Sequence, residues 1–418
     1  MLTLLPRNSQ ADGPSLLLAA ISGRSLAQSA RRAGFTPLVA DFFADTDTQE
    51  AAHACRKLKG GMNKGLQEQP LLRALEALAE RAPSPILGFV YGAGFEDRPE
   101  LLTLIARRWP VLGNDATTVK RLKAPEIFFA ELDRLGIPHP LAASERPAKG
   151  GRWLAKRRGG AGGSHIVPSR LMKTAPDAYY QERVEGRAVS ALFVGDGSGA
   201  RVLGFSEQWT APTPKSLWRY GGAVRPAALS PASARRMASA VMRIARSFKI
   251  KGLASADFMV RDGKALLLEI NPRPGATLDI FDCGATPLLR LHLEAVSEGK
   301  LPPRALKFED AMASAIVYAE RGGAAPSGFV WPEWSADRPK SSERIDKNRP
   351  ICTVWARGST KARAKRLIKE RICKILAGFQ SVSRGEDGEQ KGRNRRSAPN
   401  DVAERQRQGG ATRQSSHR

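Results

Sequence analysis

The feature that most constrains the fold is a pair of apolar segments, residues 253–260 and 265–270, on either side of Asp262-Gly263. An Asp-Gly pair between two apolar runs is a strong signal for a β-hairpin with a two-residue turn. Polar residues that can bind cations or anions lie along this hairpin and directly after it: Asp257, Glu269, Asn271 and Arg273. The hairpin therefore predicts two neighbouring antiparallel strands that present charged groups at one place.

The register of this hairpin decides whether its two carboxylates meet. A plain two-residue loop pairs Asp257 with Leu268, which turns Glu269 to the opposite face. One bulge, or a three-residue loop, places Asp257 opposite Glu269. Mg²⁺ prefers oxygen ligands, and Mg²⁺ bound to nucleotide phosphates takes one or two protein carboxylates. A metal site here thus predicts an irregular hairpin. In the alternative interpretation, Asp257 and Glu269 are solvated strand residues, and the prolines at 272 and 274 simply end the strand.

The N-terminal residues alternate between strand and helix patterns. An apolar run at 16–21 leads into Ser22-Gly23 and a helical stretch to Ala33, and a second strand follows at 37–40. This order is a βαβ unit of a parallel sheet, and a third strand is expected at 85–91. Because the chain lacks a full GxGxxG motif, a nicotinamide cofactor is not indicated. Residues 1–115 are expected to form a doubly wound α/β domain.

Charge and cysteine content limit the classes of function. The formal charge is +26, of which residues 357–418 contribute +11, with 17 Lys/Arg against 6 Asp/Glu. Aromatic residues make up only 6% and do not interleave with a basic stripe, so nucleic-acid binding is not favoured as the main function. Four cysteines without a CxxC pair argue against zinc and disulfides and fit a reducing compartment. With no membrane-spanning run, we expect a soluble, cytoplasmic protein.

The end of the chain changes in composition. A basic helix is expected from residue 360 to 376, after which the apolar periodicity is lost. Residues 379–418 are rich in Gln, Arg, Gly and Ser, and this composition predicts a disordered basic tail.

Two further segments have patterns found at nucleotide sites. Lys156 lies on a short strand that enters a loop with four glycines, and glycine-rich backbone can close over phosphates with its N–H groups. The alternative is a flexible hairpin tip. The segment 181–186 alternates polar and apolar residues, so its backbone edge could bind an adenine while a carboxylate holds ribose; the alternative is an edge strand with solvated charges.

Taken in order, these segments resemble the ATP-grasp superfamily. The resemblance covers about residues 15–300, and it implies an N-terminal α/β domain, an ATP-grasp domain at 116–300 with a lid at about 117–186, and a small C-terminal domain at 301–378. It implies phosphate contacts from Lys120, Lys156 and the loop residues Gly159, Gly160, Gly162, Gly163 and Ser164. It implies an adenine and ribose hinge at Gln181, Glu182, Val184 and Glu185, metal ligands Asp257, Glu269 and Asn271, and Arg273 as the residue that steadies an acyl phosphate. One departure is Arg187-Ala188-Val189, where many relatives carry a ribose-binding glutamate, so Glu185 or Glu182 would substitute.

The resemblance implies an ATP-dependent carboxylate–amine ligase with ATP and Mg²⁺, or Mn²⁺, as cofactors. Arg273 and Lys156 would be its catalytic residues, and a homodimer is allowed. Short segments such as 87–96, 112–114 and 331–334 resemble ligases of one-carbon carrier coenzymes of the methanopterin or methanofuran type. The alternatives are an ATP-binding protein without turnover, a carboxylase-type enzyme and a nucleic-acid-binding protein. Candidates for an acceptor pocket, with a surface loop as the alternative, are Trp218, Arg219, Tyr220 and Arg225.

Overall fold

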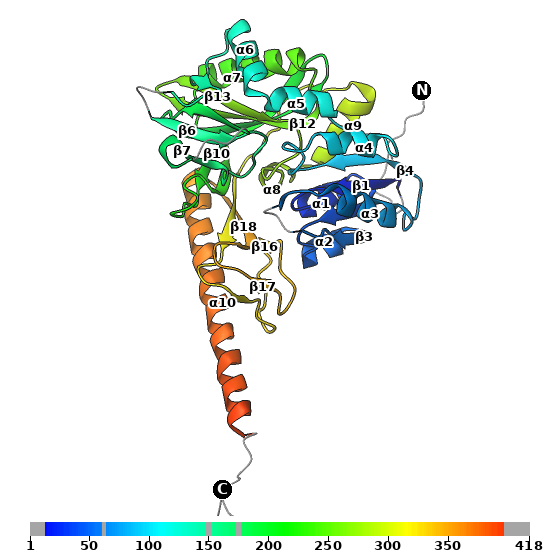
Figure 1. Cartoon of the computed structure of the whole chain (residues 1–418), viewed down its shortest axis with the longest axis vertical. Helices are drawn as coiled ribbons and strands as arrows, with labels where there is room; N and C mark the ends of the chain where they lie inside the picture. The colour runs from blue at the N-terminus through cyan, green and yellow to red at the C-terminus, as the bar shows by residue number, and fades with distance from the viewer. Residues whose placement is uncertain (1–12, 61–63, 148–151, 173–176, 397–418) are drawn as a thin grey trace, which may run out of the picture.

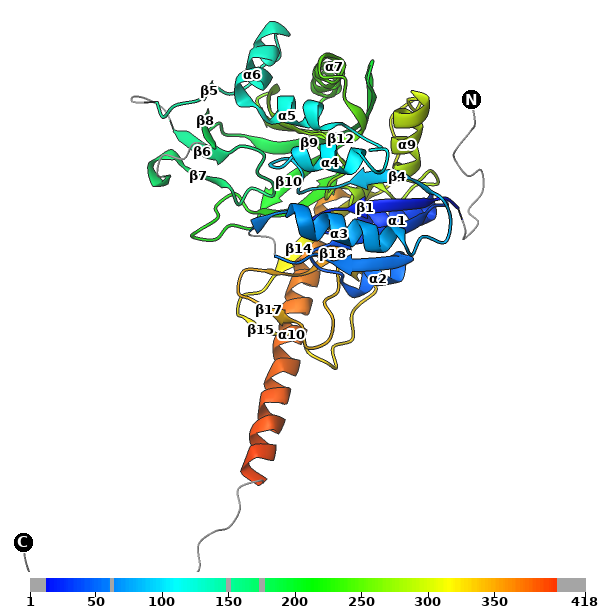
Figure 2. The same ribbon diagram turned by 45° about the vertical axis from the view of Figure 1, so that its right-hand side comes forward.

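The computed structural model describes residues 13–60, 64–147, 152–172 and 177–396. The N-terminal residues form a parallel-sheet unit that lies beside a larger unit built on antiparallel sheet (Figure 1). The last helix projects from the body as a long rod in both views (Figures 1 and 2). Within the described ranges, no helix combines the length and the apolar character that crossing a membrane requires.

The N-terminal unit is a four-stranded parallel sheet with strand order β3-β2-β1-β4. Its strands are β1 (Ser15–Ala19), β2 (Thr36–Asp41), β3 (Ala54–Lys57) and β4 (Ile86–Tyr91). Alternate residues of β1 enter two different cores, Leu16 and Leu18 on one face and Leu17 on the other. Burial on both faces explains the continuous apolar run, since helices cover each side of a parallel sheet.

Four helices provide that cover. They are α1 (Arg24–Arg32), α2 (Thr46–Ala51), α3 (Glu68–Ala79) and α4 (Glu100–Ala106). Leu26 of α1 and Ala51 of α2 belong to the first core, whereas Leu75 of α3 and Leu102 of α4 belong to the second. The prediction of a doubly wound N-terminal unit is confirmed.

A second, small sheet follows two short helices, α5 (Ala116–Lys123) and α6 (Pro125–Arg134). This sheet, which we call the lid sheet, has the strand order β5-β8-β6-β7. It consists of β5 (Ala142–Ala143), β6 (Trp153–Arg157), β7 (Ile166–Pro168) and β8 (Ala178–Glu182), with a 3₁₀ turn at Ser169–Leu171. The rings of Phe129 and Tyr179 lie 6.3 Å apart between α6 and the lid sheet, so these elements pack together.

The central sheet has eight strands in the order β13-β12-β9-β10-β11-β14-β18-β16. They are β9 (Arg187–Asp196), β10 (Ala200–Thr210), β11 (Tyr220–Arg225), β12 (Lys251–Arg261), β13 (Lys264–Asn271), β14 (Ala311–Tyr318), β16 (Ser335–Ala336) and β18 (Pro350–Gly358). Helix α7 (Pro231–Ser247) packs Met237 and Val241 into one core of this unit. Helices α8 (Leu278–Phe281) and α9 (Leu288–Glu298) share the other core with β1 and α1, which joins the two units.

The C-terminal segment is divided between the central sheet and a long helix. Strands β14, β16 and β18 belong to the central sheet, whereas β15 (Gly323–Ala324) and β17 (Arg344–Ile345) pair with each other; the domain expected at 301–378 stays a prediction. Helix α10 (Lys361–Arg396) continues past Gly378, and the disordered tail expected at 379–418 stays a prediction. Elongation of an existing helix avoids the cost of nucleation, so a polar sequence can continue one without an apolar face. Residues 397–418 lie outside the described residues.

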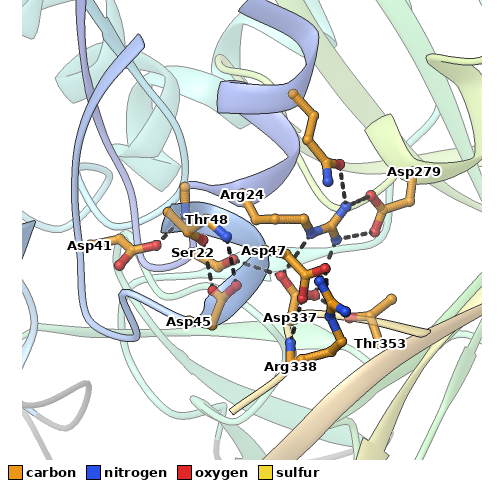
Figure 3. A network of polar contacts seen from close by, with 12 residues as sticks. Ser22, Arg24, Asp41, Asp45, Asp47, Thr48, Asp279, Asp337, Arg338 and Thr353 are labelled. Atoms are coloured by element: carbon orange, nitrogen blue, oxygen red, sulfur yellow. Dashed lines mark hydrogen bonds and ion pairs between the residues drawn. The ribbon is translucent and has the colours of Figure 1, made fainter. Parts of the chain in front are cut away.

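A buried group of ion pairs joins the N-terminal unit to the central unit (Figure 3). Arg24, at the start of α1, donates from Nη1 and Nη2 to the two carboxylate oxygens of Asp279 at 2.6 and 2.8 Å. Its Nε lies 2.9 Å from Oδ1 of Asp337, and Arg338 pairs with Asp47 at 2.9 Å. The side chain of Arg24 is only 6% exposed. Asp279 lies on α8 and Asp337 follows β16, so Arg24 joins α1 to two segments of the central unit.

Candidate functional site

The β12–β13 hairpin carries the irregularity that the sequence predicted. Asp262 and Gly263 have φ angles of 49° and 73°, and Arg261 pairs with Lys264 across a two-residue turn. The pairing then shifts by one residue, so that Asp257 lies opposite Glu269. Leu268 is the extra residue on its strand, and the prediction is confirmed.

Hydrogen bonds hold the three predicted metal-binding side chains together. Ser190 Oγ donates to Asp257 Oδ1 at 2.6 Å. Asn271 Nδ2 donates to Asp257 Oδ2 at 3.1 Å and to Glu269 Oε1 at 3.4 Å. These contacts join β9, β12 and β13, so the oxygen atoms converge on one face of the central sheet.

Lys123 is the lysine of α5 that reaches this cluster. Its Nζ donates to Asn271 Oδ1 at 3.0 Å and lies 3.9 Å from Glu269 Oε2. Lys120, the residue predicted from sequence, lies one turn earlier on α5 and is exposed. Lys123 is the last residue of α5, two residues before Pro125 begins α6. This position at the end of a helix was the signal in the sequence that could have identified Lys123.

Lys156 approaches the same carboxylates from β6 of the lid sheet. It is 5% exposed, and burial lowers the pKa of its ammonium group while the Glu269 carboxylate opposes that change. A buried ammonium group needs a nearby anion, and Glu269 provides one. The structure therefore brings the predicted Lys156 into the site.

The two carboxylates have pKa values shifted in opposite directions. Burial raises the pKa of Asp257 to about 6, and the Glu269 charge adds to this effect. Burial alone would also raise the pKa of Glu269, but Lys123 and Lys156 lower it to about 2. The first proton that this pair takes up on acidification therefore goes to Asp257, while Glu269 keeps its negative charge.

Arg273, two residues after Asn271, pairs with a carboxylate that was not among the residues predicted from sequence. Its Nε is 2.7 Å from Glu96 Oε1. Glu96 also accepts hydrogen bonds from the backbone N–H groups of Gly94 and Phe95, at 2.8 and 3.1 Å. Burial opposes ionisation, but the Arg273 charge lowers the pKa of Glu96. The place of Glu96 just after the buried strand β4, at the carboxyl edge of a parallel sheet, was the sequence signal for it.

The predicted glycine loop packs closely against its surroundings. A Cβ atom at Gly159 would overlap the backbone of Glu96 and Asp97, and one at Gly163 would overlap the carbonyl of Trp218. Gly159 and Gly163 have φ angles of 67° and 75°, a region that favours glycine. Ser164 is exposed at the end of the loop. Glycine is therefore required here for close backbone approach.

The predicted hinge residues have different environments. Gln181 is 1% exposed, and its Nε2 lies 3.5 Å from the carbonyl oxygen of Leu268, next to Glu269. Glu185 is exposed and pairs with Arg152 at 2.7 Å and Arg261 at 3.6 Å. Glu182 and Val184 are partly buried between them. Gln181 thus contacts β13 next to Glu269, whereas Glu185 pairs with the far end of β12 at Arg261.

Arg225, one of the candidates for an acceptor pocket, is buried and paired. It is 1% exposed, and its Nη1 donates to Asp310 Oδ1 at 3.0 Å while its guanidinium lies 3.7 Å from the Phe308 ring centre. Arg219 stacks on Tyr318 at 3.6 Å. The cationic groups of both residues are therefore already engaged in packing the C-terminal strands. Trp218 and Tyr220 lie beside the glycine loop through backbone contacts at Gly163 and Gly162.

Comparison with known proteins identifies the type of domain. Residues 127–277 match a family model described as the ATP-grasp domain. The large chain of carbamoyl phosphate synthase from Myxococcus xanthus is 24% identical over 192 residues, or 40% of this chain, and the match spans only 18% of that relative.

Solved structures show the same fold. A biotin carboxylase from Campylobacter jejuni, crystallised as a β-γ-ATP complex, superposes with a TM-score of 0.68 at 14% identity, over 86% of this chain and 90% of its own. An L-amino acid ligase from Bacillus licheniformis superposes with a TM-score of 0.64 at 14% identity, over 86% of this chain and 97% of its own.

Proposed function

Because this chain carries an ATP-grasp domain and has the corresponding fold, we propose that it is an ATP-dependent ligase that activates a carboxylate as an acyl phosphate and couples it to an amine. The observation that carries the proposal is the convergence of Asp257, Glu269 and Asn271 with Lys123 and Lys156. Two carboxylates and two ammonium groups around one point suit a metal ion bound to polyphosphate.

The donor set fits Mg²⁺. Asp257, Glu269 and Asn271 offer hard oxygen ligands, and Asn271 Oδ1 already binds a cation in the ammonium group of Lys123. No cluster of three His, Cys, Asp or Glu side chains suited to a metal occurs among the described residues. Two carboxylates are nevertheless sufficient where phosphates complete the coordination. When bound, Mg²⁺ or Mn²⁺ would neutralise phosphate charge.

The remaining residues would position ATP. Phosphoryl transfer depends chiefly on positioning and on stabilisation of charge, which ammonium groups and backbone N–H donors provide. Lys123 and Lys156 would hold phosphate oxygens from opposite sides, and the glycine loop at 159–163 would cover them. Gln181 and its neighbours in the hinge would lie along the nucleoside.

The chemistry would proceed in two displacements. A carboxylate oxygen of the substrate attacks the γ-phosphorus, the bond to the β–γ bridging oxygen breaks, and ADP leaves. The amine then attacks the carbonyl carbon of the acyl phosphate, inorganic phosphate leaves, and the nitrogen releases a proton. Arg273, held by Glu96, would stabilise the charge of the acyl phosphate.

A carboxylase is the second candidate, because biotin carboxylase is among the proteins with the same fold. In that case the activated carboxylate would be bicarbonate. A protein that binds ATP without turnover is the third. The sequence resemblance to ligases of one-carbon carrier coenzymes directs the choice of substrates, with glutamate and a pterin- or furan-linked acid as the first pair to test.

The experiment is ADP release with Mg²⁺ and ATP in the presence of matched panels of carboxylates, amines and bicarbonate. Hydroxylamine should trap an activated carboxylate as a hydroxamate, and Glu269→Gln should abolish both signals. Asp262→Asn, at the exposed tip of the same hairpin, is the matched control and should behave like the parent. Release that requires bicarbonate alone would favour the carboxylase, and Mg²⁺-dependent binding without release would favour the non-catalytic protein.

A further inference from the structure

Two short segments of the N-terminal unit, residues 87–96 and 112–114, meet at the turn that carries Arg273. Residues 110–112 run beside β4, and the backbone hydrogen bonds between them extend the parallel sheet. Both segments end at the carboxyl edge of this sheet, the edge at which ligands bind in folds of this class. Asn114, the last residue of the second segment, has no part in the proposed chemistry.

The side chain of Asn114 joins the N-terminal unit to both strands of the β12–β13 hairpin. Its Oδ1 accepts from the backbone N–H of Lys251, the first residue of β12, at 2.8 Å, and its Nδ2 donates to the Lys251 carbonyl at 2.9 Å. Nδ2 also donates to the carbonyl of Pro272, the residue after β13, at 2.9 Å. Asn114 is only 2% exposed, and these three bonds use both amide hydrogens and the amide oxygen.

The bond to Pro272 fixes the point from which the Arg273 side chain departs. A peptide unit is planar, so a carbonyl oxygen held at Pro272 also holds the nitrogen and Cα of Arg273. The turn is tight, because the backbone N–H of Arg273 donates to the carbonyl of Asn271 at 2.9 Å. Prolines on both sides of Arg273 leave the backbone few other conformations.

Tyr91, the last residue of β4, contributes less to the Pro272 carbonyl. Its hydroxyl oxygen lies 2.8 Å from the carbonyl oxygen of Asn114 but 3.4 Å from that of Pro272. Burial raises the pKa of Tyr91, so the hydroxyl keeps its single hydrogen. Because the shorter contact takes that hydrogen, Asn114 provides the main hydrogen bond to Pro272.

The guanidinium of Arg273 is held at Nε and has a free nitrogen beyond it. Nε pairs with Glu96 Oε1 at 2.7 Å, and Nη1 lies 3.4 Å from the carbonyl oxygen of Pro274. Within the residues that the structure describes, Nη2 has no hydrogen-bond partner. Burial raises the pKa of Asp257 and the Arg273 charge opposes this change, so the guanidinium lies near the candidate metal site.

We propose that Asn114 is a positioning residue, which sets the place of the Arg273 guanidinium and so makes binding of the acyl phosphate depend on the docking of the N-terminal unit. This inference rests on the proposed function, because it takes the anion held by Arg273 to be an acyl phosphate. Hydrogen bonds weaken steeply when donor and acceptor are misaligned. A shift of the turn at 272–274 therefore weakens anion binding and leaves the nucleotide contacts of Lys123 and Lys156 in place.

His292 is a matched control, because it joins the same two units without contacting the Arg273 turn. Its Nδ1 accepts from the backbone N–H of Leu253 on β12 at 2.8 Å, so its Nε2 carries the hydrogen and donates to the carbonyl of Leu112 at 2.7 Å. Like Asn114, it is 2% exposed. Replacement of either residue leaves buried backbone groups unpaired, but of the two only Asn114 holds Pro272.

The test measures binding of the nucleotide and of an acyl-phosphate analogue separately. MgADP is titrated calorimetrically into the parent and each variant, and acetylphosphonate, a stable analogue of acetyl phosphate, is then titrated into the MgADP complex. Asn114→Ala removes all three hydrogen bonds. Asn114→Ser keeps one hydroxyl and answers the same question if Asn114→Ala does not fold. His292→Ala is the control, and Arg273→Met shows the effect of losing the guanidinium itself.

We expect acetylphosphonate to bind the MgADP complex of the parent and not that of Arg273→Met. Asn114→Ala should weaken acetylphosphonate binding about tenfold, as expected for one charge-assisted hydrogen bond, and Asn114→Ser at least about threefold. MgADP binding should stay within about twofold of the parent in both, and His292→Ala should leave both ligands within about twofold.

Three results would overturn the inference. They are acetylphosphonate binding that is unchanged in Asn114→Ala and Asn114→Ser, equal losses in Asn114→Ala and His292→Ala, and equal weakening of MgADP and acetylphosphonate by Asn114→Ala. A parent that binds MgADP but not acetylphosphonate would overturn it as well, because Arg273 would then hold no acyl phosphate. A parent that binds no MgADP would instead mean that the proposed function fails.

Discussion

Replacement of Asp257 by asparagine should stabilise the metal-free protein, and the gain should depend on pH. The folded protein raises the pKa of this carboxyl from 3.8 to about 6 through burial and the Glu269 charge. The folded state therefore binds more protons than the unfolded state between these values, and stability falls as the pH rises through this window. Above about pH 6 the folded protein bears the full free-energy cost of holding this carboxylate in its ionised form. At about 1.4 kcal/mol for each pH unit, the cost is about 3 kcal/mol.

Asparagine removes the charge and keeps the shape. Its carbonyl oxygen can still accept the hydrogen bond that Ser190 donates to Asp257. Its amide nitrogen, however, replaces the oxygen that accepts the hydrogen bond from Asn271 Nδ2, a loss of about 1 kcal/mol. We therefore expect Asp257→Asn to raise the free energy of unfolding by about 2 kcal/mol at pH 8 and by less than about 1 kcal/mol at pH 4. The same substitution should abolish Mg²⁺-dependent ATP binding, because it removes an anionic ligand.

Urea denaturation at several pH values, in the presence of a chelator, measures this difference. Asp262→Asn is the control, since this carboxylate is 87% exposed in the same hairpin and its replacement should change stability by no more than about 0.5 kcal/mol at any pH. The prediction is wrong if Asp257→Asn lowers the free energy of unfolding at pH 8. It is also wrong if Asp257→Asn raises that free energy by the same amount at pH 4 as at pH 8. Either result would mean that Lys123 and Asn271 stabilise the ionised Asp257 more than burial and the Glu269 charge destabilise it.

Three further outcomes follow from the geometry. Lys123→Met should weaken MgATP binding roughly 10- to 100-fold, as expected for a charge-assisted hydrogen bond, whereas Lys120→Met should stay within about twofold; comparable losses measured by calorimetry would contradict the assignment of Lys123. Arg24→Ala should lower stability by about 3–5 kcal/mol, because Asp279 and Asp337 remain buried without their cation, and a urea midpoint unchanged from the parent would count against the junction in Figure 3. Glu96→Gln should lower stability at pH 7 and have progressively less effect at acidic pH, because a carboxyl with a lowered pKa stabilises the fold only when ionised; a loss independent of pH in urea titrations would argue against the ion pair with Arg273.

Local patterns in the sequence were sufficient to predict the β12–β13 hairpin and the parallel sheet of the N-terminal unit. The Asp262-Gly263 turn and the requirement that Asp257 face Glu269 together predicted a three-residue loop or a bulge, since side chains in a strand alternate strictly between faces. The structure has the bulge, at Leu268. The alternation of apolar strands and helices likewise identified the parallel sheet.

Contacts between distant segments were not predictable in this way. Lys120 and Lys123 are one turn apart on α5, and only the packing of α5 against the central sheet decides which of them reaches Asn271. Arg225 is a cationic residue beside aromatic ones in the sequence, as a ligand-binding residue can be, but the partly exposed carboxylate of Asp310 and the ring of Phe308 engage it. Glu96 acquires its role only through Arg273, which follows it by 177 residues. Such pairings depend on tertiary structure, about which periodicity carries no information.

The proposed function requires that the carboxylates of β12 and β13 bind a metal–nucleotide complex. Calorimetric titration of ATP into the parent and into Glu269→Gln, each with Mg²⁺ and with a chelator, tests it most directly. We predict binding to the parent that requires Mg²⁺ and is lost in folded Glu269→Gln but kept in Asp262→Asn. ATP binding of equal strength in the parent and in Glu269→Gln, with or without Mg²⁺, would contradict the account.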